Sequence, residues 1–397
     1  MASSGIYVHI PFCVKKCFYC DFFSVACDDA KIRKEYTRAL LKEIMFYGIK
    51  YGKNFKADTV FFGGGTPSLM EPEFIEKILG ALKNYFTIDD DCEITIECNP
   101  ATLSVDKLNR YRSMGVNRLS IGAQSFDDDV LQKLGRIHKS EDIFKTVNLA
   151  RSAGFENISL DLMFAVPGQD EKIWKESVEK TLELRPEHIS FYSLEIGENT
   201  VFGKMLKKGD FIETPIEEDR RMYAVGLDMI EKAGYKQYEI SNASLRGMEC
   251  RHNLKYWNLS EYLGLGAGAH SFIRDVRYSN LLNVREYYNT MWSQDMTSMI
   301  RFESSSAFGA NCVDSYNVNT YKDNVSEYAF TALRTTKGIV FDDFKRKFKN
   351  EFWDLYSSQR AEFEKFVKNG YAVYDVRHMA LTRKGMNISN KIMALFV

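Results

Sequence analysis

Long apolar runs and an excess of charge are both missing from this sequence of 397 residues. No uninterrupted apolar stretch approaches the roughly 20 residues that a membrane-spanning helix needs. Met1 to Gly5 also lack the charged and apolar regions of a signal peptide. The formal net charge is -1, so no global positive field attracts nucleic acid, and we expect no nucleic-acid partner. These absences predict a cytoplasmic protein, or an organellar one whose transit peptide has been removed.

Cysteine is sparse for a secreted disulfide scaffold, because the chain has only eight. Three of them, Cys13, Cys17 and Cys20, cluster near the N-terminus, and the others are scattered at positions 27, 92, 98, 250 and 312. A tight cluster in a large chain is typical of a metal site in a reducing compartment. A chain of this length can bury a full core without disulfides.

Strand-like and helix-like patterns alternate over the first two thirds of the chain. Short apolar or alternating segments at 6–10, 59–62, 93–97, 118–121, 158–163 and 189–194 predict six strands. Between them, apolar residues recur every three or four positions, as at Ile32, Tyr36, Leu40, Ile44 and Tyr47. This alternation favours a parallel sheet, and we predict a partial (β/α)6 TIM-like barrel, with an open doubly wound sheet as the alternative.

The later part of the chain has a different pattern. We predict a domain over 1–240, a small connecting α+β region over 241–310 and a helical, winged-helix-like domain over 311–397. In the last segment, helices are expected over 341–348 and 363–367, and a hairpin over 371–374 and 378–381. A winged shape alone does not imply DNA binding.

The cysteine cluster has the spacing C-x3-C-x2-C, formed by Cys13, Cys17 and Cys20. Thiolates hold iron–sulfur clusters, and three of them leave one iron of a [4Fe–4S] cubane without a protein ligand. An open coordination position is what a small-molecule cofactor needs in order to bind a metal directly. The alternative is a structural zinc, for which Cys27 or His9 could be the fourth ligand, although no second C-x2-C pair exists.

Further polar residues follow the predicted strands at the edge where parallel sheets bind ligands. Gly63-Gly64-Gly65-Thr66-Pro67 follows the second strand, and glycines let a backbone approach a ligand closely. Glu97 ends the third strand, where a carboxylate could accept hydrogen bonds from a ribose or could simply lie on the surface. Asp161 lies in an apolar strand, where an unpaired charge is costly, which favours a functional or paired role.

Together these motifs resemble the radical SAM superfamily. The segment Tyr7-Val-His-Ile-Pro-Phe-Cys13, the cysteine spacing and the Gly-Gly-Gly-Thr-Pro-Ser run are more narrowly similar to the branch of oxygen-independent coproporphyrinogen oxidase (HemN) and its relative, the haem chaperone HemW. The resemblance implies a [4Fe–4S] cluster and S-adenosylmethionine (SAM) as cofactors, with one or two SAM molecules. It implies cluster ligands at Cys13, Cys17 and Cys20, and cofactor-binding residues at Tyr7, Tyr19, Gly64, Gly65, Thr66, Glu97, Gln124, Arg136, Asp161 and His252. For Arg136, a solvated ion pair is the alternative.

Two features favour the HemW side of this branch. HemN-type oxidases carry a further cysteine two residues after the third, where this chain has Phe22. His252-Asn-Leu-Lys-Tyr256-Trp257 resembles the HemW signature His-Asn-x-x-Tyr-Trp, and an imidazole can ligate haem iron. A hydrogen-bonded structural histidine is the alternative for His252, and Cys250 is an alternative haem ligand or a free buried thiol.

The resemblance therefore implies a haem-binding chaperone that delivers haem to membrane-bound respiratory proteins, as a monomer or homodimer. We expect no coproporphyrinogen oxidase activity, and whether SAM is cleaved or only bound stays open. The alternatives are an oxygen-independent coproporphyrinogen III oxidase and a radical SAM enzyme acting on an unrelated substrate.

Overall fold

The structure is a computed structural model that describes residues 3–293 and 310–397. Its main feature is a twelve-stranded sheet with the order β14-β13-β12-β11-β1-β4-β5-β6-β7-β8-β10-β9. The strands of this sheet are β1 (Ser4–Ile10), β4 (Lys56–Gly64), β5 (Thr87–Cys98), β6 (Arg118–Gln124), β7 (Ile158–Phe164), β8 (His188–Ser193), β9 (Lys236–Glu239), β10 (Asn242–Ser244), β11 (Tyr262–Leu265), β12 (His270–Ile273), β13 (Val276–Asn280) and β14 (Val313–Val318).

The six predicted strands correspond to β1, β4, β5, β6, β7 and β8. They are parallel and lie side by side in the order in which they occur along the chain. A doubly wound sheet would reverse its strand order at a switch point, so the sequential order confirms the partial barrel. Strand β11 adds a further parallel neighbour on the free side of β1, and β12, β13 and β14 continue the sheet in antiparallel fashion.

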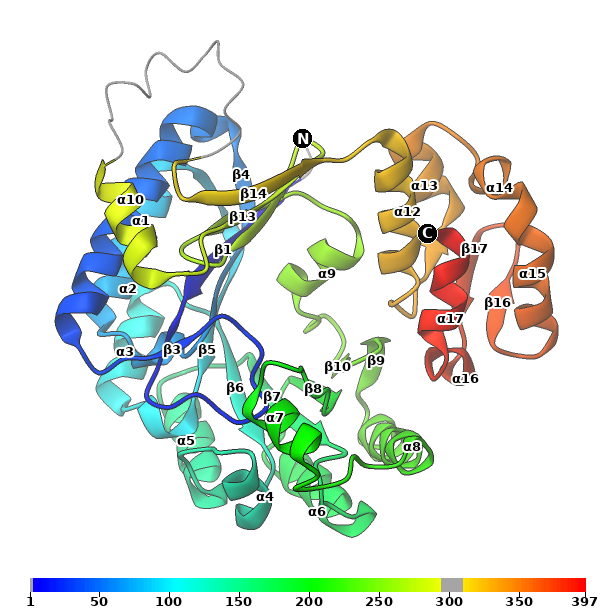
Figure 1. Cartoon of the computed structure of the whole chain (residues 1–397), viewed down its shortest axis with the longest axis horizontal. Coiled ribbons are helices and arrows are strands. Elements are labelled where there is room, and N and C mark those ends of the chain that lie inside the picture. The colour runs from blue at the N-terminus through cyan, green and yellow to red at the C-terminus, as the bar shows by residue number, and fades with distance from the viewer. Residues whose placement is uncertain (1–2, 294–309) are drawn as a thin grey trace.

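Helices cover the outer face of the curved sheet (Figure 1). The helices of this part are α1 (Ala30–Tyr51), α2 (Pro72–Tyr85), α3 (Val105–Met114), α4 (Asp128–Lys133), α5 (Ser140–Ser152), α6 (Glu171–Glu183), α7 (Val201–Lys208), α8 (Ile216–Lys232), α9 (Arg251–Trp257) and α10 (Val284–Ser293). The predicted apolar stripe of α1 is fully buried at Tyr36, Leu40, Ile44 and Tyr47. Several helices begin at a residue whose side chain accepts a backbone N–H, as Ser104 does from Lys107 and Asp170 from Ile173.

The C-terminal module lies to one side of the barrel, and α9 lies between them, in contact with β1, β4 and α12 (Figure 1). Its three-stranded sheet, with the order β15-β17-β16, packs with helices around a separate apolar core, as expected for a winged-helix-like arrangement. The elements are α12 (Tyr321–Ala332), β15 (Ile339–Val340), α13 (Phe341–Phe348), α14 (Phe352–Leu355), α15 (Ser357–Lys368), β16 (Ala372–Tyr374), β17 (His378–Leu381), α16 (Arg383–Met386) and α17 (Ser389–Met393).

The predicted domain boundaries stay predictions, but two observations bear on them. Strand β14 falls in the predicted 311–397 segment and yet pairs with β13 in the main sheet. Residues 294–309 of the predicted 241–310 segment lie outside the described residues. No helix within 3–293 and 310–397 is long and apolar enough to cross a bilayer.

Candidate functional site

The cysteine-bearing loop starts directly after β1 and closes on itself. A short parallel pair between β2 (Phe12–Cys13) and β3 (Val25–Ala26) joins its two ends. Cys13 is buried, whereas Cys17 and Cys20 are half-buried. The aromatic residues Phe18 and Tyr19 pack on an apolar cluster from α4, β7 and α7, so the loop is anchored on the barrel.

The three thiols lie near one another and near two donors. Burial raises the pKa of both Cys13 and Cys20, and the neighbouring Cys17 adds to each shift. The Thr66 hydroxyl lies 3.5 Å from the Cys13 Sγ, and the Arg136 Nη1 lies 3.6 Å from the Cys17 Sγ. A thiolate set with hydrogen-bond donors to its sulfurs fits the chemistry of an iron–sulfur cluster.

The three thiols are not arranged as the ligands of a single metal ion are. In the part of the chain that the structure describes, no group of three His, Cys, Asp or Glu side chains could hold a single metal ion. A tetrahedral zinc holds each sulfur at about 2.3 Å and therefore draws its ligands tightly together. The ligands of a cubane each bind a separate iron and need not meet at one point.

The glycine-rich run forms the turn that follows β4. Gly64 has φ +113°, and a Cβ added to it would lie 2.5 Å from the His9 ring. The Gly65 amide donates to the Ile10 carbonyl at 2.8 Å, and the Thr66 amide donates to the Phe12 carbonyl at 2.8 Å. Glycine is thus required sterically at Gly64, and the turn is tied to the start of the cysteine loop.

Two half-buried carboxyl groups face a common cavity. The Gly64 amide donates to the Glu97 carboxylate at 3.0 Å. Burial raises the pKa of Glu97 to about 7, and the nearby Asp161 adds to the rise. The hydroxyls of Ser120 and Ser159 donate to Asp161 at 3.0 Å, and burial raises the pKa of Asp161 as well. Glu97 is therefore not a surface strand residue, and Asp161 is paired with hydroxyls.

Arg136, Tyr19 and Gln124 lie at the cysteines rather than on the cavity wall. The half-buried Arg136 donates through Nη2 to the Gly122 carbonyl at 2.7 Å, and it interacts with both Tyr19 and Cys17. It is therefore not a solvated ion pair. Gln124 ends β6 in the left-handed region, with φ +66°, and its side chain lies against Gly122 beside Arg136. A non-glycine residue in that conformation is often held there at a functional site.

His252 lies on α9 and is fully buried. Its Nδ1 lies 2.8 Å from the Thr59 hydroxyl, and its Nε2 lies 2.9 Å from the Tyr256 hydroxyl. Its ring stacks on Phe61, with centroids 5.2 Å apart. Both ring nitrogens are engaged, so ligation of an iron by His252 would require breaking one of these bonds. Cys250 is a buried free thiol whose Sγ lies 3.7 Å from the Glu93 carboxylate.

A cavity of about 570 Å³ joins these elements at the carboxyl ends of the parallel strands. Its volume falls within the range of small-molecule sites. Of the predicted cofactor-binding residues, it is lined by Tyr7, Gly64, Glu97, Asp161 and His252.

Residues outside the predicted cofactor-binding set also line this cavity, notably His9, Arg118, Ser120, Tyr192 and His270. Arg118 is fully buried beside Asp161, and it was interpreted only as the first residue of a strand. Two features of the sequence could have indicated a role for Arg118. It is a charged residue at the start of an apolar strand, and the next strand along the chain carries the acidic residue Asp161.

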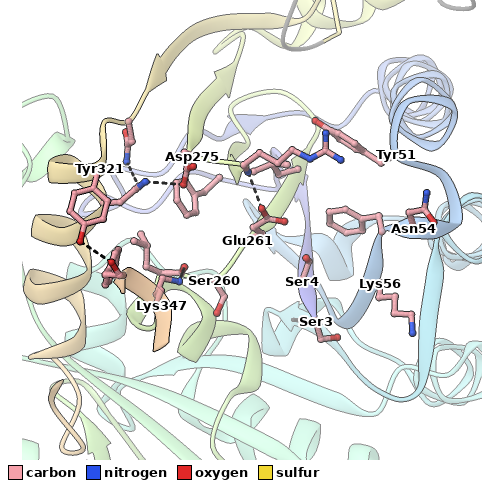
Figure 2. Close-up of a pocket in the computed structure, with 18 residues that line it drawn as sticks. Ser3, Ser4, Tyr51, Asn54, Lys56, Ser260, Glu261, Asp275, Tyr321 and Lys347 are labelled. Carbon is pink, nitrogen blue, oxygen red and sulfur yellow. Dashed lines mark hydrogen bonds between the residues drawn. The ribbon is translucent and has the colours of Figure 1, made fainter. Parts of the chain in front are cut away.

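A second cavity, of about 850 Å³, lies between the barrel and the C-terminal module (Figure 2). It contains the amino ends of β1 and β4, at Ser3, Ser4 and Lys56, and none of the predicted site residues. Many of its polar groups are already paired: Asn324 donates to Asp275 at 2.8 Å, and Lys347 donates to the Leu259 carbonyl at 2.6 Å. Ligands of parallel sheets bind at the carboxyl ends of the strands, so the smaller cavity is the candidate site.

Comparison with known proteins gives consistent results. The family model of the radical SAM superfamily matches residues 7–181. The heme chaperone HemW of Bacillus subtilis is 36% identical over 395 residues, covering 98% of this chain and 98% of the relative. HemW of Lactococcus lactis is 33% identical and covers 99% and 97% of the two chains. HemW of Escherichia coli is 37% identical over 269 residues, covering 67% and 69%.

Among solved structures, coproporphyrinogen III oxidase (HemN) of Escherichia coli, described as a radical SAM enzyme, superimposes with a TM-score of 0.84. The alignment covers 99% of this chain and 90% of that one at 22% identity. At this level of identity the likeness establishes the shared fold.

Proposed function

This chain belongs to the HemW family within the radical SAM superfamily, and on that basis we propose that it is a haem-binding chaperone. It holds a [4Fe–4S] cluster on Cys13, Cys17 and Cys20, binds SAM beside it, and passes haem to membrane-bound respiratory proteins. It acts in the cytoplasm as a monomer or homodimer, without a nucleic-acid partner.

Different residues around the cysteines and the cavity bind the cluster and SAM. Thr66 and Arg136 donate to the sulfurs, and Tyr19 covers the loop. The turn at Gly64 and Gly65 brings its backbone to the open side of the cluster. When bound, the cluster supplies an open iron and an electron to SAM.

The Glu97 carboxyl group at the cavity wall binds the nucleoside part of SAM. Glu97 accepts from the ribose hydroxyls while the Gly64 amide orients its other lone pairs. Tyr7 lines the same cavity, Gln124 lies beside Arg136, and Asp161 stays hydrogen-bonded to its two serines.

The observation that carries the proposal is Phe22. It occupies the position at which HemN-type oxidases have a further cysteine, it lines the cavity, and it is 72% exposed. Covering an exposed aromatic ring with an apolar ligand is favourable, because it removes apolar surface from water. A porphyrin face is an apolar surface of suitable chemistry to do so.

A paired measurement on cluster-reconstituted protein tests the proposal. We expect a stable haem complex, seen as a Soret band on titration, and no oxidation of coproporphyrinogen with SAM and a reductant under anaerobic conditions. Porphyrinogen turnover would instead support the oxidase, which shares the fold. Cleavage of SAM with modification of a different substrate would support an unrelated enzyme.

A pair of variants sharpens the test. Phe22→Ala is expected to weaken haem binding, because it removes the apolar cover at the cavity mouth. Val376→Ala is the matched control, since Val376 is 93% exposed but lies in the C-terminal module between β16 and β17. Equal haem affinity in both variants would remove Phe22 from the haem site.

A further inference from the structure

The six histidines of the chain differ sharply in what their rings contact. His9, His138, His188 and His252 are buried, and each forms at least one ring hydrogen bond. His378 is part-exposed and pairs with Asp375 at 3.2 Å. His270 alone combines an exposed side chain with a ring that has no hydrogen bond in the described part of the chain. A free imidazole at a cavity is available to a metal, whereas a doubly bonded one is not.

His270 begins β12 and borders the candidate cavity together with Gly268 and Leu282. A Cβ added to Gly268 would lie 2.8 Å from the Phe23 ring and 3.2 Å from Leu282, so these residues pack closely. Leu282 is 62% exposed, and Phe22, also at this cavity, is 72% exposed. An unpartnered imidazole therefore borders a wall of partly exposed apolar side chains.

A free imidazole beside apolar side chains suits haem, which has an iron that binds nitrogen ligands and a large apolar ring. We propose that His270 supplies the axial nitrogen to haem iron at the mouth of this cavity, with Phe22, Phe23 and Leu282 covering the porphyrin. The inference rests on the proposed haem-binding function and deepens it. His252 then acts as a positioning residue: it fixes the hydroxyl of Tyr256 and the ring of Phe61, both of which line the same cavity.

Ligation by His270 breaks no hydrogen bond of its ring among the residues that the structure describes. Partial burial, and then the charge of Arg277, lowers the pKa of His270, which favours the neutral imidazole that binds a metal. A bond forms between its ring nitrogen and the iron, and the water or hydroxide held by free haem leaves. No proton is lost from the ring, and the oxidation state of the iron does not change. For His252, the same bond would first have to displace Tyr256 or Thr59.

Haem titration of reconstituted full-length protein tests this assignment. We expect His270→Ala to weaken haem binding at least tenfold and to shift the Soret band, and His270→Gly to recover the original spectrum when free imidazole is added. His378→Ala, which changes a histidine remote from the cavity, is expected to match the unmodified protein. Far-ultraviolet circular dichroism and iron content confirm that each variant is folded and holds its cluster.

The outcomes separate this inference from the proposed function. If the unmodified protein binds no haem, the proposed function fails, and this inference fails with it. If it binds haem and His270→Ala keeps the same spectrum and affinity, the function stands and the ligand assignment is overturned. Loss of binding in His270→Gly that imidazole does not restore also overturns the assignment, because it shows a structural role.

Discussion

The Gly64 amide donates a 3.0 Å hydrogen bond to the Glu97 carboxylate, which joins the end of β4 to the end of β5 at the cavity. This one contact places the glycine-rich turn and the predicted ribose acceptor on the same side of the cavity. It also gives Glu97 one backbone donor, while the nearby Asp161 acts on the same carboxyl. Burial outweighs that donor and keeps the pKa of Glu97 near 7.

SAM binding should depend on pH through Glu97. Ribose hydroxyls donate to the ionised carboxylate, so binding favours the charged form, while the free protein holds a proton below about pH 7. We expect SAM affinity to fall by up to about tenfold per pH unit below 7. Calorimetry at pH 6.5 in buffers of different ionisation enthalpy should detect proton release.

Glu97→Gln removes the titrating group, and its SAM affinity should be lower and independent of pH over this range. Glu156→Gln changes an exposed carboxylate and serves as the control. A pH profile that is the same in Glu97→Gln as in the unmodified protein would place the titration elsewhere.

The raised pKa of Glu97 should also affect the stability of the ligand-free protein. A carboxyl whose pKa rises from 4.5 to about 7 on folding stabilises the folded state at low pH, and that contribution is lost as the pH rises through 7. At pH 8 ionised Glu97 should therefore destabilise the fold by up to about 3 kcal/mol. Urea unfolding of Glu97→Gln should show a larger free energy of unfolding than the unmodified protein at pH 8, and a difference that shrinks by pH 4.5.

Substitution of Gly64 should be costly for steric reasons. Gly64→Ala forces a Cβ at φ +113° to within 2.5 Å of the His9 ring, which is itself bonded to Tyr7 and to the Phe23 carbonyl. We expect a loss of about 1–3 kcal/mol in the free energy of unfolding. Gly80→Ala is the matched control, because Gly80 lies in α2 with no atom near its Cβ position, and alanine there should stabilise by about 0.5–1 kcal/mol.

Much of the barrel could be predicted because its signals are local. Each parallel strand is a short apolar run, and each covering helix has an apolar stripe with a period of 3.6 residues. The order of the elements, and whether each is a helix or a strand, therefore follow from the sequence. Asp161 could be predicted for a related reason, since a carboxylate in an apolar strand is costly unless it is used or paired, whereas the role of Glu97 came from the family resemblance. The helix over 341–348 and the strand over 378–381 match α13 and β17.

What could not be predicted depends on distant contacts. Strands β11 to β14 are short, and Gly264 to Gly268 gives no clear period, so their place in the sheet is set by the pairing of β11 with β1 and of each later strand with the one before it. The bond that occupies the Nδ1 of His252 comes from Thr59, 193 positions away. The sequence motif therefore indicates His252 as a ligand, whereas the packing leaves the ring of His270 open.

The cluster prediction is tested by colour and iron content. Anaerobically purified protein should be brown, and the triple change of Cys13, Cys17 and Cys20 to alanine should remove both the colour and the acid-labile sulfide. Cys27→Ala is the control, because Cys27 is half-buried and its Sγ lies near the Asp29 carbonyl. Loss of the cluster in Cys27→Ala, or its retention in the triple variant, would contradict the assigned ligands.

Arg136 should set the reduction potential of the cluster. Its guanidinium is buried, donates to the Cys17 sulfur through Nη1 and is held by the Gly122 carbonyl through Nη2. A positive donor at a ligand sulfur stabilises the reduced cluster, which carries one more negative charge. Arg136→Met keeps much of the side-chain volume and removes this interaction, so the potential should become more negative by on the order of 50–100 mV.

A potentiometric titration followed by electron paramagnetic resonance measures this shift directly. Lys145→Met, which removes an exposed cation on α5, should leave the potential within a few millivolts because solvent screens that charge. If Arg136→Met keeps its cluster at an unchanged potential, the contact with Cys17 has no electrostatic role. If the cluster is lost and returns in Arg136→Lys, the positive charge holds the loop in place, and its effect lies in assembly of the site rather than in its potential.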